Sequence, residues 1–529
     1  MLRRGQPCDG MRNRESSVSP DHFNVVIIGA GLSGIGAACH LQKHCPTKTL
    51  AILEARDCIG GTWDLFRYPG VRSDSDMFTL GYSFRPWTAT KSIADGASIL
   101  EYIRATAAEN AVDRRIRFNH RVVRASWSSN ESRWTLEAER GPLREVTRLT
   151  CDFVFACSGY YSYAEGYTPP LPGIARFKGV VVHPHRWRQD VAYAGKRVVV
   201  IGSGATAITL VPELAKAAAH VTMLQRSPTY VVAWPDEDRI ANALRRFLPA
   251  GIACGIARWK NVLGGMYFYH LCKRNPARAK RMILDGVRAE LGPAFDVGSH
   301  FTPRYDPWNQ RLCLAPNGDF FESIRHGRTS VVTDEIKTFT ETGLELRSGS
   351  RLDADIVVTA TGLTMQVLGG AQIDVDGRST EPATTISYKG ALYSDIPNFA
   401  SVFGYTNASW TLKSDLICDY VCRLINYMER HGYDVCTPRN TDPTLERLPP
   451  VDFSSGYFQR AMDKLPRQGS RKPWRIHQNY VRDLIALRLA PIDDGVLEFA
   501  ARPVLPDDAQ SCAPGRTWWA PRRPEAHAR

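Results

Sequence analysis

Residues 23–44 read FNVVIIGAGLSGIGAACHLQKH, an apolar run followed by a glycine turn and a helical segment. An uninterrupted apolar run is typical of a strand buried on both faces of a parallel sheet. In the turn, Gly29 permits a tight bend, Gly31 lets the backbone approach a pyrophosphate, and Gly34 lets the helix pack close to the strand. Together with the apolar segment TLAILE at 49–54, the pattern predicts a βαβ unit that binds a dinucleotide.

An acidic residue ends the second predicted strand of this unit. Glu54 lies 20 residues beyond Gly34, where a carboxylate can accept hydrogen bonds from ribose hydroxyls and repels a 2′-phosphate. The unit lies close to the start of the chain, which is usual for a permanently held FAD. A second glycine pair, Gly60-Gly61, follows soon after and can bring further backbone N–H groups to the cofactor. We therefore expect FAD at this unit.

The same pattern returns later in the chain. Residues 196–202 (KRVVVIG) predict a strand, and the turn Gly202-Ser203-Gly204-Ala205-Thr206-Ala207 has alanine in place of the third glycine, a tolerated variant. The next predicted strand ends in Gln225-Arg226 instead of an acid. A guanidinium there can pair with a 2′-phosphate, so this unit favours NADPH over NADH. The alternative for Arg226 is an ordinary surface arginine.

A third apolar strand ending in glycine, DIVVTATG at 355–362, completes the predicted organisation. The fold class expected is α/β, with two Rossmann-like domains for FAD and NADP, the second inserted in the first, and a helical insert. The expected boundaries are a disordered lead at 1–20, the first part of the FAD domain at 21–175, the NADP domain at 176–335 with a basic helical insert at about 236–300, the second part of the FAD domain with the C-terminal region at 336–502, and a disordered tail at 503–529.

Composition excludes several classes of protein. Hydrophobic residues make up 43% of the 529 residues and charged residues 23%, the balance of a soluble globular enzyme. No apolar stretch is long enough for a membrane span, and no apolar core follows Arg3 and Arg4 to make a secretory signal. The 13 cysteines include no CxxC pair and no zinc spacing, so no metal site is expected, a dithiol reductase is disfavoured, and a reducing cytoplasm fits. Cys418 and Cys422 are interpreted as structural thiols on a buried helix face.

The net charge of +13 is unevenly distributed. Between Ala241 and Glu290 ten Lys and Arg residues stand against Asp285 and Glu290, which gives +8 in that segment. Apolar residues such as Ile252, Trp259 and Leu263 alternate with the basic ones. This arrangement favours peripheral contact with the inner face of the cell membrane or with an acidic ligand, and not nucleic acid. The alternative is a helical insert with a solvated basic face.

A motif between the two units resembles a known family signature. Residues 177–187 read FKGVVVHPHRW, which fits F-x-G-x-x-x-H-x-x-x-W and resembles the fingerprint of Baeyer–Villiger monooxygenases, the class B flavoprotein monooxygenases. Trp187 stands where related heteroatom-oxidising flavin monooxygenases generally have tyrosine, and Arg188 stands where the fuller signature has proline or aspartate. The stretches GGTWDLFRYPGVRSDSDMF and HVTMLQRSPTY also resemble this family, and the resemblance extends over residues 22–500 approximately.

The resemblance implies a set of site residues. Besides the glycines named above, the FAD contacts implied are Ser33, Glu54, Thr62, Trp63, Asp64, Leu65, Asp74 and Val122. The NADP contacts implied are Arg72, Ser73, Asp74, Ser203, Gly204, Ala205, Thr206, Ala207, Ile208, Thr209, Gln225 and Arg226. The candidate catalytic residues are Arg311, Asp74, His183 and Trp187, the last two thought to link domain motion to cofactor binding without touching substrate.

The resemblance also implies a reaction. NADPH reduces the flavin, O2 adds to it, and Arg311, held by Asp74, stabilises the flavin C4a-peroxide that converts a ketone to an ester or oxidises sulfur. The implied partners are therefore O2 and a small ketone or sulfur-containing molecule. Two alternatives remain open: a heteroatom hydroxylase without ketone activity, and a non-catalytic nucleotide-binding protein at the membrane surface. From the sequence without the resemblance, Arg311 would be interpreted as part of a structural ion pair.

Overall fold

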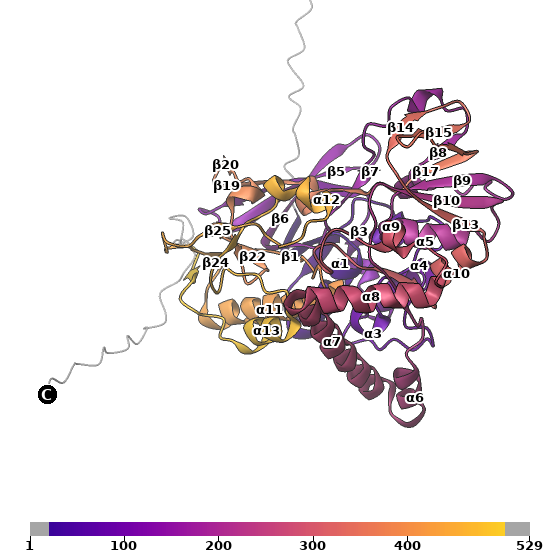
Figure 1. The fold of residues 1–529 in the computed structure, drawn as a ribbon. Helices are drawn as coiled ribbons and strands as arrows, with labels where there is room; N and C mark the ends of the chain where they lie inside the picture. Colours follow the sequence, from indigo (N-terminus) through magenta and orange to yellow (C-terminus); the bar gives the residue numbers. More distant parts are fainter. Residues whose placement is uncertain (1–20, 503–529) are drawn as a thin grey trace, which may run out of the picture.

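The computed structural model describes residues 21–502 (Figure 1). The segments expected to be disordered, 1–20 and 503–529, lie outside the described residues. Two sheets organise the molecule, a mixed sheet of nine strands and a parallel sheet of five strands. The strands at 21–156, 372–379 and 399–401 belong to the first sheet, and those of the second lie between residues 156 and 372 in the chain. The expected fold of two dinucleotide-binding units, one inserted in the other, is therefore confirmed.

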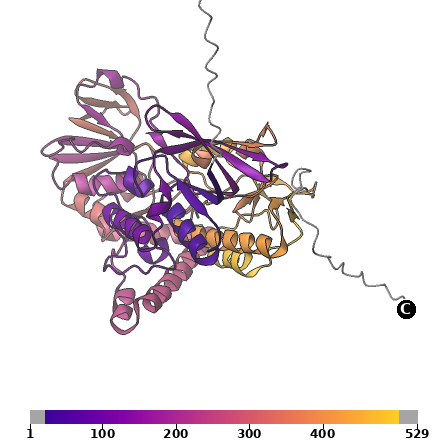
Figure 2. The same cartoon turned by 180° about the vertical axis from the view of Figure 1, so that it is seen from behind.

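The first sheet is built around the strand that precedes the first glycine turn. β1 (Asp21–Ile28) pairs in parallel with β2 (Leu50–Leu53) and with β6 (Glu145–Ala156). The other strands of this sheet are β3 (Ile116–Arg117), β4 (His120–Ser128), β5 (Arg133–Arg140), β19 (Gln372–Val375), β20 (Arg378–Ser379) and β23 (Phe399–Ser401). On one side of the sheet, α1 (Leu32–His44) packs against α11 (Trp410–His431), and both views show α11 below the strands (Figures 1 and 2).

Helix α11 also settles the interpretation of two cysteines. Cys418 and Cys422 are 1% and 2% exposed and belong to the same apolar core as Ile35 and Leu41 of α1. Burial raises the pKa of the Cys418 thiol well above its usual range, and a thiol with a raised pKa is a poor nucleophile. The two cysteines lie on a buried helix face, as the sequence predicted.

The second sheet has the strand order β13-β10-β9-β17-β8, with every pair parallel. Its strands are β8 (Val180–Val182), β9 (Arg197–Ile201), β10 (His220–Gln225), β13 (Thr329–Thr333) and β17 (Ile356–Thr359). Helices α5 (Ala205–Leu214) and α10 (Asp319–Arg325) pack against each other beside it. Because β17 inserts between β9 and β8, this sheet ends at Thr359, beyond the boundary at 335 that the sequence suggested.

Antiparallel strands account for the displaced boundary. β14 (Ile336–Phe339), β15 (Gly343–Leu346) and β16 (Arg351–Asp353) form a separate three-stranded sheet before the chain returns to β17. The chain then returns to the first unit through β18 (Leu363–Met365), which pairs with β7 (Tyr161–Gly166) in a short two-stranded antiparallel sheet. The two units are therefore joined by a paired linker.

The remaining short elements lie around the first unit and its C-terminal region. They are α2 (Thr62–Leu65), α3 (Met77–Leu80), α4 (Gly96–Glu109), α12 (Gly456–Gln459), α13 (Tyr480–Leu484), β21 (Ser387–Tyr388), β22 (Leu392–Tyr393), β24 (Val435–Pro438), β25 (Arg447–Leu448), β26 (Gln468–Gly469) and β27 (Leu497–Ala500).

The segment 236–300 is helical, as expected, and lies between β11 (Val231–Trp234) and β12 (Cys313–Pro316). Its helices are α6 (Arg239–Phe247), α7 (Ala250–Arg274), α8 (Pro276–Leu291) and α9 (Val297–Phe301). Figure 1 shows α6 at the tip of the molecule and α7 running from that tip back to the first unit. Within residues 21–502, no helix combines the length and apolarity needed to cross a bilayer.

One arginine attaches α7 to the first unit. The Arg258 guanidinium donates to the carbonyl oxygens of Phe78 and Gly81, at 3.1 and 2.9 Å, and pairs with the Asp415 carboxylate at 3.2 Å. The side chains of Arg258 and Asp415 are 11% and 5% exposed. Without the guanidinium, the buried Asp415 carboxylate would lose one of the cations that neutralise it. Removal of one partner from a buried ion pair is strongly destabilising.

We predict that Arg258→Met lowers the free energy of unfolding by about 3–5 kcal/mol, because Asp415 and two carbonyl groups lose a buried partner. The urea midpoint of the first unfolding transition, followed by tryptophan fluorescence, measures the change. The control is Arg246→Met, which removes the same charge from an exposed position of α6 and should shift the free energy by less than about 0.5 kcal/mol. Equal midpoints for the two variants would contradict the prediction.

Candidate functional site

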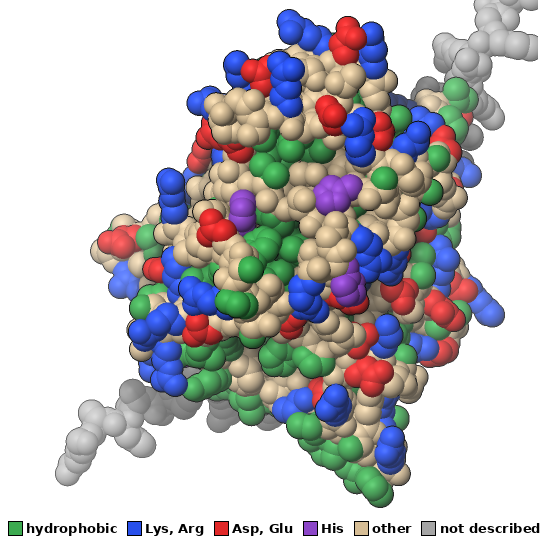
Figure 3. All heavy atoms as spheres, turned by 45° about the vertical axis from the view of Figure 1, so that its right-hand side comes forward, with side chains coloured by type: hydrophobic (Ala, Val, Ile, Leu, Met, Phe, Trp, Pro, Cys, Tyr) green, Lys and Arg blue, Asp and Glu red, His purple; other side chains and the backbone are tan. Residues whose placement is uncertain are grey.

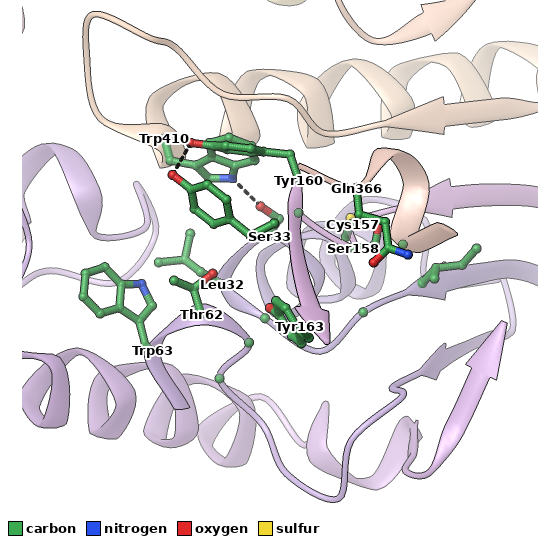
Figure 4. A pocket seen from close by; sticks show the side chains of 18 of the residues that line it. Leu32, Ser33, Thr62, Trp63, Cys157, Ser158, Tyr160, Tyr163, Gln366 and Trp410 are labelled. Atoms are coloured by element: carbon green, nitrogen blue, oxygen red, sulfur yellow. Dashed lines mark hydrogen bonds between the residues drawn. The ribbon is translucent and has the colours of Figure 1, made fainter. Parts of the chain in front are cut away.

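A cavity of about 420 Å³ lies where the glycine turn after β1 meets the linker between the units. Its walls come from distant parts of the chain, and Figure 4 shows the side chains around it. Residues from the sequence-predicted set that line it are Gly29, Gly31, Ser33, Glu54, Thr62, Trp63, Ser73, Asp74, Val122 and Arg311. The structure therefore brings most of the predicted FAD contacts together at one cavity.

The three glycines of the first turn differ in their surroundings. Gly29 has φ +103°, and a Cβ on it would lie 2.8 Å from the carbonyl oxygen of Cys157. A Cβ on Gly34 would lie 1.8 Å from the carbonyl oxygen of Gly29, so strand and helix touch at that point. A Cβ on Gly31 would make only an ordinary contact, 3.5 Å from the Cα of Gly61. Protein packing therefore leaves room beside Gly31, at the N-terminus of α1, where free N–H groups and the helix dipole favour a phosphate.

Glu54 closes the turn from the side of β2. Its Oε2 accepts a hydrogen bond from the backbone N–H of Ala30 at 2.7 Å, and its Oε1 accepts one from that of Arg56 at 2.9 Å. The side chain is 4% exposed. Burial raises the pKa of Glu54, while the two N–H groups act in the opposite direction. The carboxylate is thus fixed at the end of β2, with its place on the cavity wall as the sequence predicted.

An aromatic wall of the cavity was not predicted from the sequence. Trp410, at the start of α11, donates from Nε1 to the hydroxyl of Ser33 at 2.7 Å (Figure 4). The ring of Tyr160 stacks on Trp410 with centroids 5.1 Å apart, and its hydroxyl lies 2.9 Å from that of Tyr161. Tyr163, on β7, also lines the cavity. None of these residues belongs to the glycine turns or the fingerprint, and a sequence does not distinguish an aromatic side chain on a cavity wall from one in the core.

Two predicted FAD contacts lie away from the cavity. Asp64 and Leu65 are not among the residues that line it. The Asp64 carboxylate is 1% exposed and accepts hydrogen bonds from three arginines, Arg56, Arg67 and Arg104. It therefore holds the loop of Gly60 and Gly61 in place. Successive residues of a helix are rotated by about 100°, so Thr62 and Trp63 line the cavity while Asp64 and Leu65, further round α2, do not.

Arg311 lies at the junction of the two units. Its Nε and Nη2 donate to the two oxygens of Asp74, at 2.7 and 2.9 Å, in a bidentate pair. The side chains are 29% and 35% exposed, so both still face the cavity. Desolvation acts to lower the pKa of Arg311, but the Asp74 carboxylate and nearby tyrosines outweigh it, and the net pKa is raised. The guanidinium is therefore a permanent positive charge at the cavity wall.

A second ion pair between the two units is formed by Arg72, two residues before Asp74 in the chain. Arg72, expected to contact NADP, forms an ion pair with both carboxylate oxygens of Asp319 at the start of α10. Ser73, between Arg72 and Asp74, is 4% exposed. The segment 72–74 of the first unit is therefore tied to the second unit at both of its ends.

The second glycine turn repeats the geometry of the first. Gly202 has φ +124°, and a Cβ on it would lie 2.3 Å from the carbonyl oxygen of Ala360, whereas a Cβ on Gly204 would meet nothing within 4 Å. Ser203 bonds to the hydroxyl of Thr229 at 2.8 Å, and Arg226 is exposed at the end of β10. Open space beside Gly204 and the N-terminus of α5 therefore fit a pyrophosphate, with Arg226 available for a 2′-phosphate.

Some predicted NADP contacts have packing roles instead. Gln225 is 2% exposed and donates to the carbonyl oxygen of His300 and the hydroxyl of Thr333, at 2.7 and 2.9 Å. Ala207 and Ile208 are fully buried in the core of the second unit, and Thr209 is 7% exposed. The free face of α5 begins with Ala205 and Thr206, which are partly exposed.

The two fingerprint residues, His183 and Trp187, lie outside the cavity of about 420 Å³, called the flavin-sized cavity below. They also lie outside a second cavity of about 220 Å³ that adjoins it. The ring of His183 packs so closely on Gly166 of β7 that a Cβ there would lie 2.0 Å from it. Trp187 packs at the edge of the second core, near Tyr193. Both were candidate catalytic residues, but His183 contacts the linker and Trp187 contacts the second unit. Of the four candidates, only Arg311 and Asp74 reach the cavity.

Comparisons with known proteins agree with this geometry. A family model described as flavin-binding monooxygenase-like matches residues 86–242, and one described as an NAD(P)-binding Rossmann-like domain matches residues 27–90. The chain is 54% identical to the FAD-containing monooxygenase EthA of Mycobacterium tuberculosis over 485 residues, which are 91% of this chain and 99% of that protein. It is 52% identical to EthA of Mycolicibacterium smegmatis over 480 residues, 90% of this chain and 97% of that protein.

Solved structures give the same picture. An oxidised steroid monooxygenase bound to NADP matches with a TM-score of 0.66 and 26% identity, covering 79% of this chain and 88% of that chain. A cyclohexanone monooxygenase in an open form has the same fold, with a TM-score of 0.67 and 22% identity over 79% of this chain and 90% of that chain.

We predict opposite defects for two alanine substitutions in the first turn. Gly34→Ala should lower the free energy of unfolding by about 1–3 kcal/mol, as overpacking does, because its Cβ collides with backbone. Gly31→Ala should change the stability of the flavin-free protein by less than about 0.5 kcal/mol, yet weaken FAD binding about tenfold or more (~1.4 kcal/mol). Urea denaturation of the apoprotein and titration with FAD measure the two effects. Normal FAD affinity in Gly31→Ala would contradict the assignment of the open space.

Proposed function

The chain belongs to the family of FAD-containing monooxygenases, and from this premise we propose that it performs Baeyer–Villiger oxygenation. One atom of O2 is inserted next to the carbonyl of a ketone, at the expense of NADPH, and sulfur in a sulfur-containing substrate is oxidised at the same site. The observation that carries the proposal is the bidentate pair of Arg311 with Asp74, which puts a permanent positive charge on the wall of the flavin-sized cavity.

The binding residues follow from the space that the protein leaves. FAD is held at the turn beside Gly31, with its pyrophosphate at the N-terminus of α1 and its ribose near Glu54, and the aromatic wall of Tyr160 and Trp410 encloses the cavity. NADPH is held at the turn beside Gly204, with Arg226 paired to its 2′-phosphate. The bound flavin supplies the chemistry of O2 activation. The protein supplies orientation, exclusion of water and charge.

Arg311 acts on the charge that develops during oxygenation. Attack on a ketone places negative charge on the carbonyl oxygen, and a fixed cation nearby stabilises that charge without reorganisation. Asp74 holds the guanidinium through two bonds and so fixes its orientation. Burial acts to lower the pKa of Arg311, but Asp74 and the nearby tyrosines outweigh it and the net pKa is raised, so the guanidinium keeps its positive charge.

His183 and Trp187 serve as positioning residues in this proposal. His183 packs on β7, and His185 bonds through Nε2 to the carbonyl oxygen of Ser162 on the same strand at 2.9 Å. The linker formed by β7 and β18 is where one unit can rotate relative to the other. Contact of the fingerprint with this linker supports a role in coupling NADPH binding to the relative position of the units.

We predict that Arg311→Ala retains FAD and oxidises NADPH but forms ester from a ketone at least about 100-fold more slowly, the size of effect typical for removal of a preorganised charge. Product mass, with NADPH consumption recorded in parallel, measures the uncoupling. The control is Arg148→Ala, which breaks an exposed ion pair with Glu137 within the first sheet and should leave ester formation unchanged.

Three outcomes would contradict the proposal. Ester formation at the normal rate in Arg311→Ala would remove this residue from the reaction. Sulfur oxidation without any ketone oxidation by the unmodified enzyme would favour the second candidate, a heteroatom hydroxylase. No oxidation of NADPH with either kind of substrate would favour a non-catalytic nucleotide-binding protein.

We also propose that the tip formed by α6 and the start of α7 touches the inner surface of the cell membrane. Phe247 is 85% exposed, Ile252 56% and Ile256 45%, and hydrophobic side chains gather at this lower tip in Figure 3. Exposed arginines lie nearby, among them Arg246. An apolar tip with a basic margin is the combination that binds an anionic lipid surface.

We predict that the protein sediments with vesicles of phosphatidylglycerol more than with vesicles of phosphatidylcholine, and that the double variant Phe247→Asp/Ile252→Asp loses this binding about tenfold or more, given ~1.5–3 kcal/mol for each buried large apolar side chain. Leu143→Asp is the matched control, because Leu143 is 84% exposed in a loop far along the chain from the insert. Equal sedimentation of all three proteins would exclude contact through this tip, and self-association without lipid would assign the tip to a second copy of the chain.

A further inference from the structure

A second cavity of about 220 Å³ adjoins the flavin-sized one. The two share five lining residues: Asp74, Ser75, Arg311, Tyr405 and Ala408. Arg311 therefore stands between two connected spaces, one on the side of the glycine turn and the other on the side of the helical insert. The second space has no part in the binding of either dinucleotide proposed above.

Helix α7 forms one wall of this second cavity. The residues of α7 that line it are Asn261, Val262, Gly265, Met266, Tyr269 and His270. They form adjacent pairs that recur every four residues and so lie along one side of the helix. Gly265 and His270 are also exposed to solvent, so this side of α7 reaches the surface of the molecule where it lines the cavity.

A second, apolar stripe runs along α7 next to the cavity wall. Trp259 is 43% exposed, Leu263 54% and Tyr267 71%. With about 100° of rotation per residue, this stripe lies roughly a quarter of a turn away from the residues that line the cavity. The stripe leads along α7 to the exposed residues Ile252 and Ile256, and so toward the tip that carries Phe247 on α6. The exposed part of the cavity wall at Gly265, which we call its mouth, therefore lies beside apolar side chains.

Gly265 has no side chain to narrow this mouth. A Cβ on Gly265 would meet no atom within 4 Å, so packing does not require glycine there, although glycine is unfavourable inside a helix. A large side chain at this position would lie at the edge of the opening. Its neighbour Gly264 is equally free of contacts but does not line the cavity, which makes Gly264 a matched control position on the same helix.

Two buried polar atoms of residues that line the cavity have no partner. The indole Nε1 of Trp308 and the amide Oδ1 of Asn407 are both buried, and neither has a hydrogen-bond partner among residues 21–502. Asn407 is oriented by its Nδ2, which donates to the carbonyl oxygen of Gln478 at 3.0 Å. Unpaired buried donors and acceptors are costly. A ligand that accepts from Trp308 and donates to Asn407 would satisfy both.

The backbone at Trp308 gives a further indication of function. Trp308 has φ +67°, a conformation that residues other than glycine rarely adopt and that tends to occur at functional sites. Its ring meets Tyr269 of α7 edge to face, with centroids 5.9 Å apart. The strained loop therefore carries Trp308 to the cavity wall three residues before Arg311.

We propose that the second cavity is the entry route and binding chamber for an elongated lipophilic substrate that carries a polar group besides the one oxidised. The substrate enters at Gly265 from the apolar surface of α7. Its polar group bonds to Trp308 and Asn407, its apolar part lies against Val262, Met266 and Leu412, and its reacting group reaches Arg311. Gly265 sets the width of the entrance and so the length and bulk of substrate accepted. The assignment rests on the oxygenase function proposed above.

The test uses the FAD-loaded enzyme, NADPH and a series of 2-alkanones from four to twelve carbons, with kcat/KM for ester formation as the readout. Gly265→Leu should lower the ratio of kcat/KM for the longest to that for the shortest ketone by about tenfold or more, because leucine narrows the entrance. Gly264→Leu should retain the ratio of the unmodified enzyme. Leucine is a better helix former than glycine, so both variants should fold, which urea denaturation verifies.

A second variant tests the polar pair separately. Trp308→Phe keeps an aromatic ring against Tyr269 but removes the N–H donor. We expect the unmodified enzyme to have a lower KM for a long ketone with an added hydroxyl group than for the plain ketone, and Trp308→Phe to lose at least about three quarters of that preference at nearly constant kcat. Loss of kcat with an unchanged KM ratio would instead indicate a structural role and would overturn the assignment of Trp308.

The outcomes separate the two levels of the proposal. No oxygenated product from any ketone in the unmodified enzyme would overturn the proposed function, and the chamber with it. Product formation in the unmodified enzyme together with identical chain-length ratios in Gly265→Leu and Gly264→Leu would overturn the entry route alone.

Discussion

One short segment of the first unit reaches the second unit at two points beside the cavity. Arg72 pairs with Asp319 and Asp74 pairs with Arg311, so residues two apart in the chain reach two different parts of the second unit. Each pair joins opposite charges from different units, and both lie beside the space proposed for the cofactors. The position of Arg311 relative to the flavin-sized cavity therefore depends on the distance between the units, and a motion at the linker of β7 and β18 necessarily moves it.

The pair of Arg311 and Asp74 is poorly suited to a purely structural role. Both side chains are about one third exposed, and ion pairs open to solvent contribute little to stability. The more buried ionic contacts lie elsewhere, as between Lys413 and Asp483, which are 3% and 5% exposed. An arginine that is always charged, held at two points and still open to a cavity is better suited to interact with a charge that appears during a reaction.

The sequence predicted the fold because each dinucleotide unit is a local pattern of strand, glycine turn and helix. It failed where local order does not determine spatial order. The second unit extends to Thr359 because β17 inserts between β9 and β8, which no local signal reveals. A motif likewise gives positions along the chain but not the direction of each side chain, so Thr62 and Trp63 reach the cavity while Asp64 binds arginines. Trp410, at the start of α11, and Tyr160, just before β7, were missed because neither belongs to a glycine turn or to the fingerprint.

The helical insert illustrates a different limit of sequence interpretation. Its charge of +8 suggested a basic face, but two of its cations are paired with carboxylates of low exposure: Arg258 with Asp415 and Lys260 with Asp238. Others, such as Arg246 and Lys273, remain exposed, so the surface of the insert is both basic and apolar. Because the same arginine that neutralises Asp415 also fixes α7 against the first unit, charge burial there determines where the apolar stripe and the cavity wall lie. Helix α7 is thus anchored by a buried charge and exposes hydrophobic side chains on one face, the reverse of an ordinary surface helix. This arrangement fits the proposals that the outer face of α7 meets an apolar phase and that its inner face lines a substrate chamber.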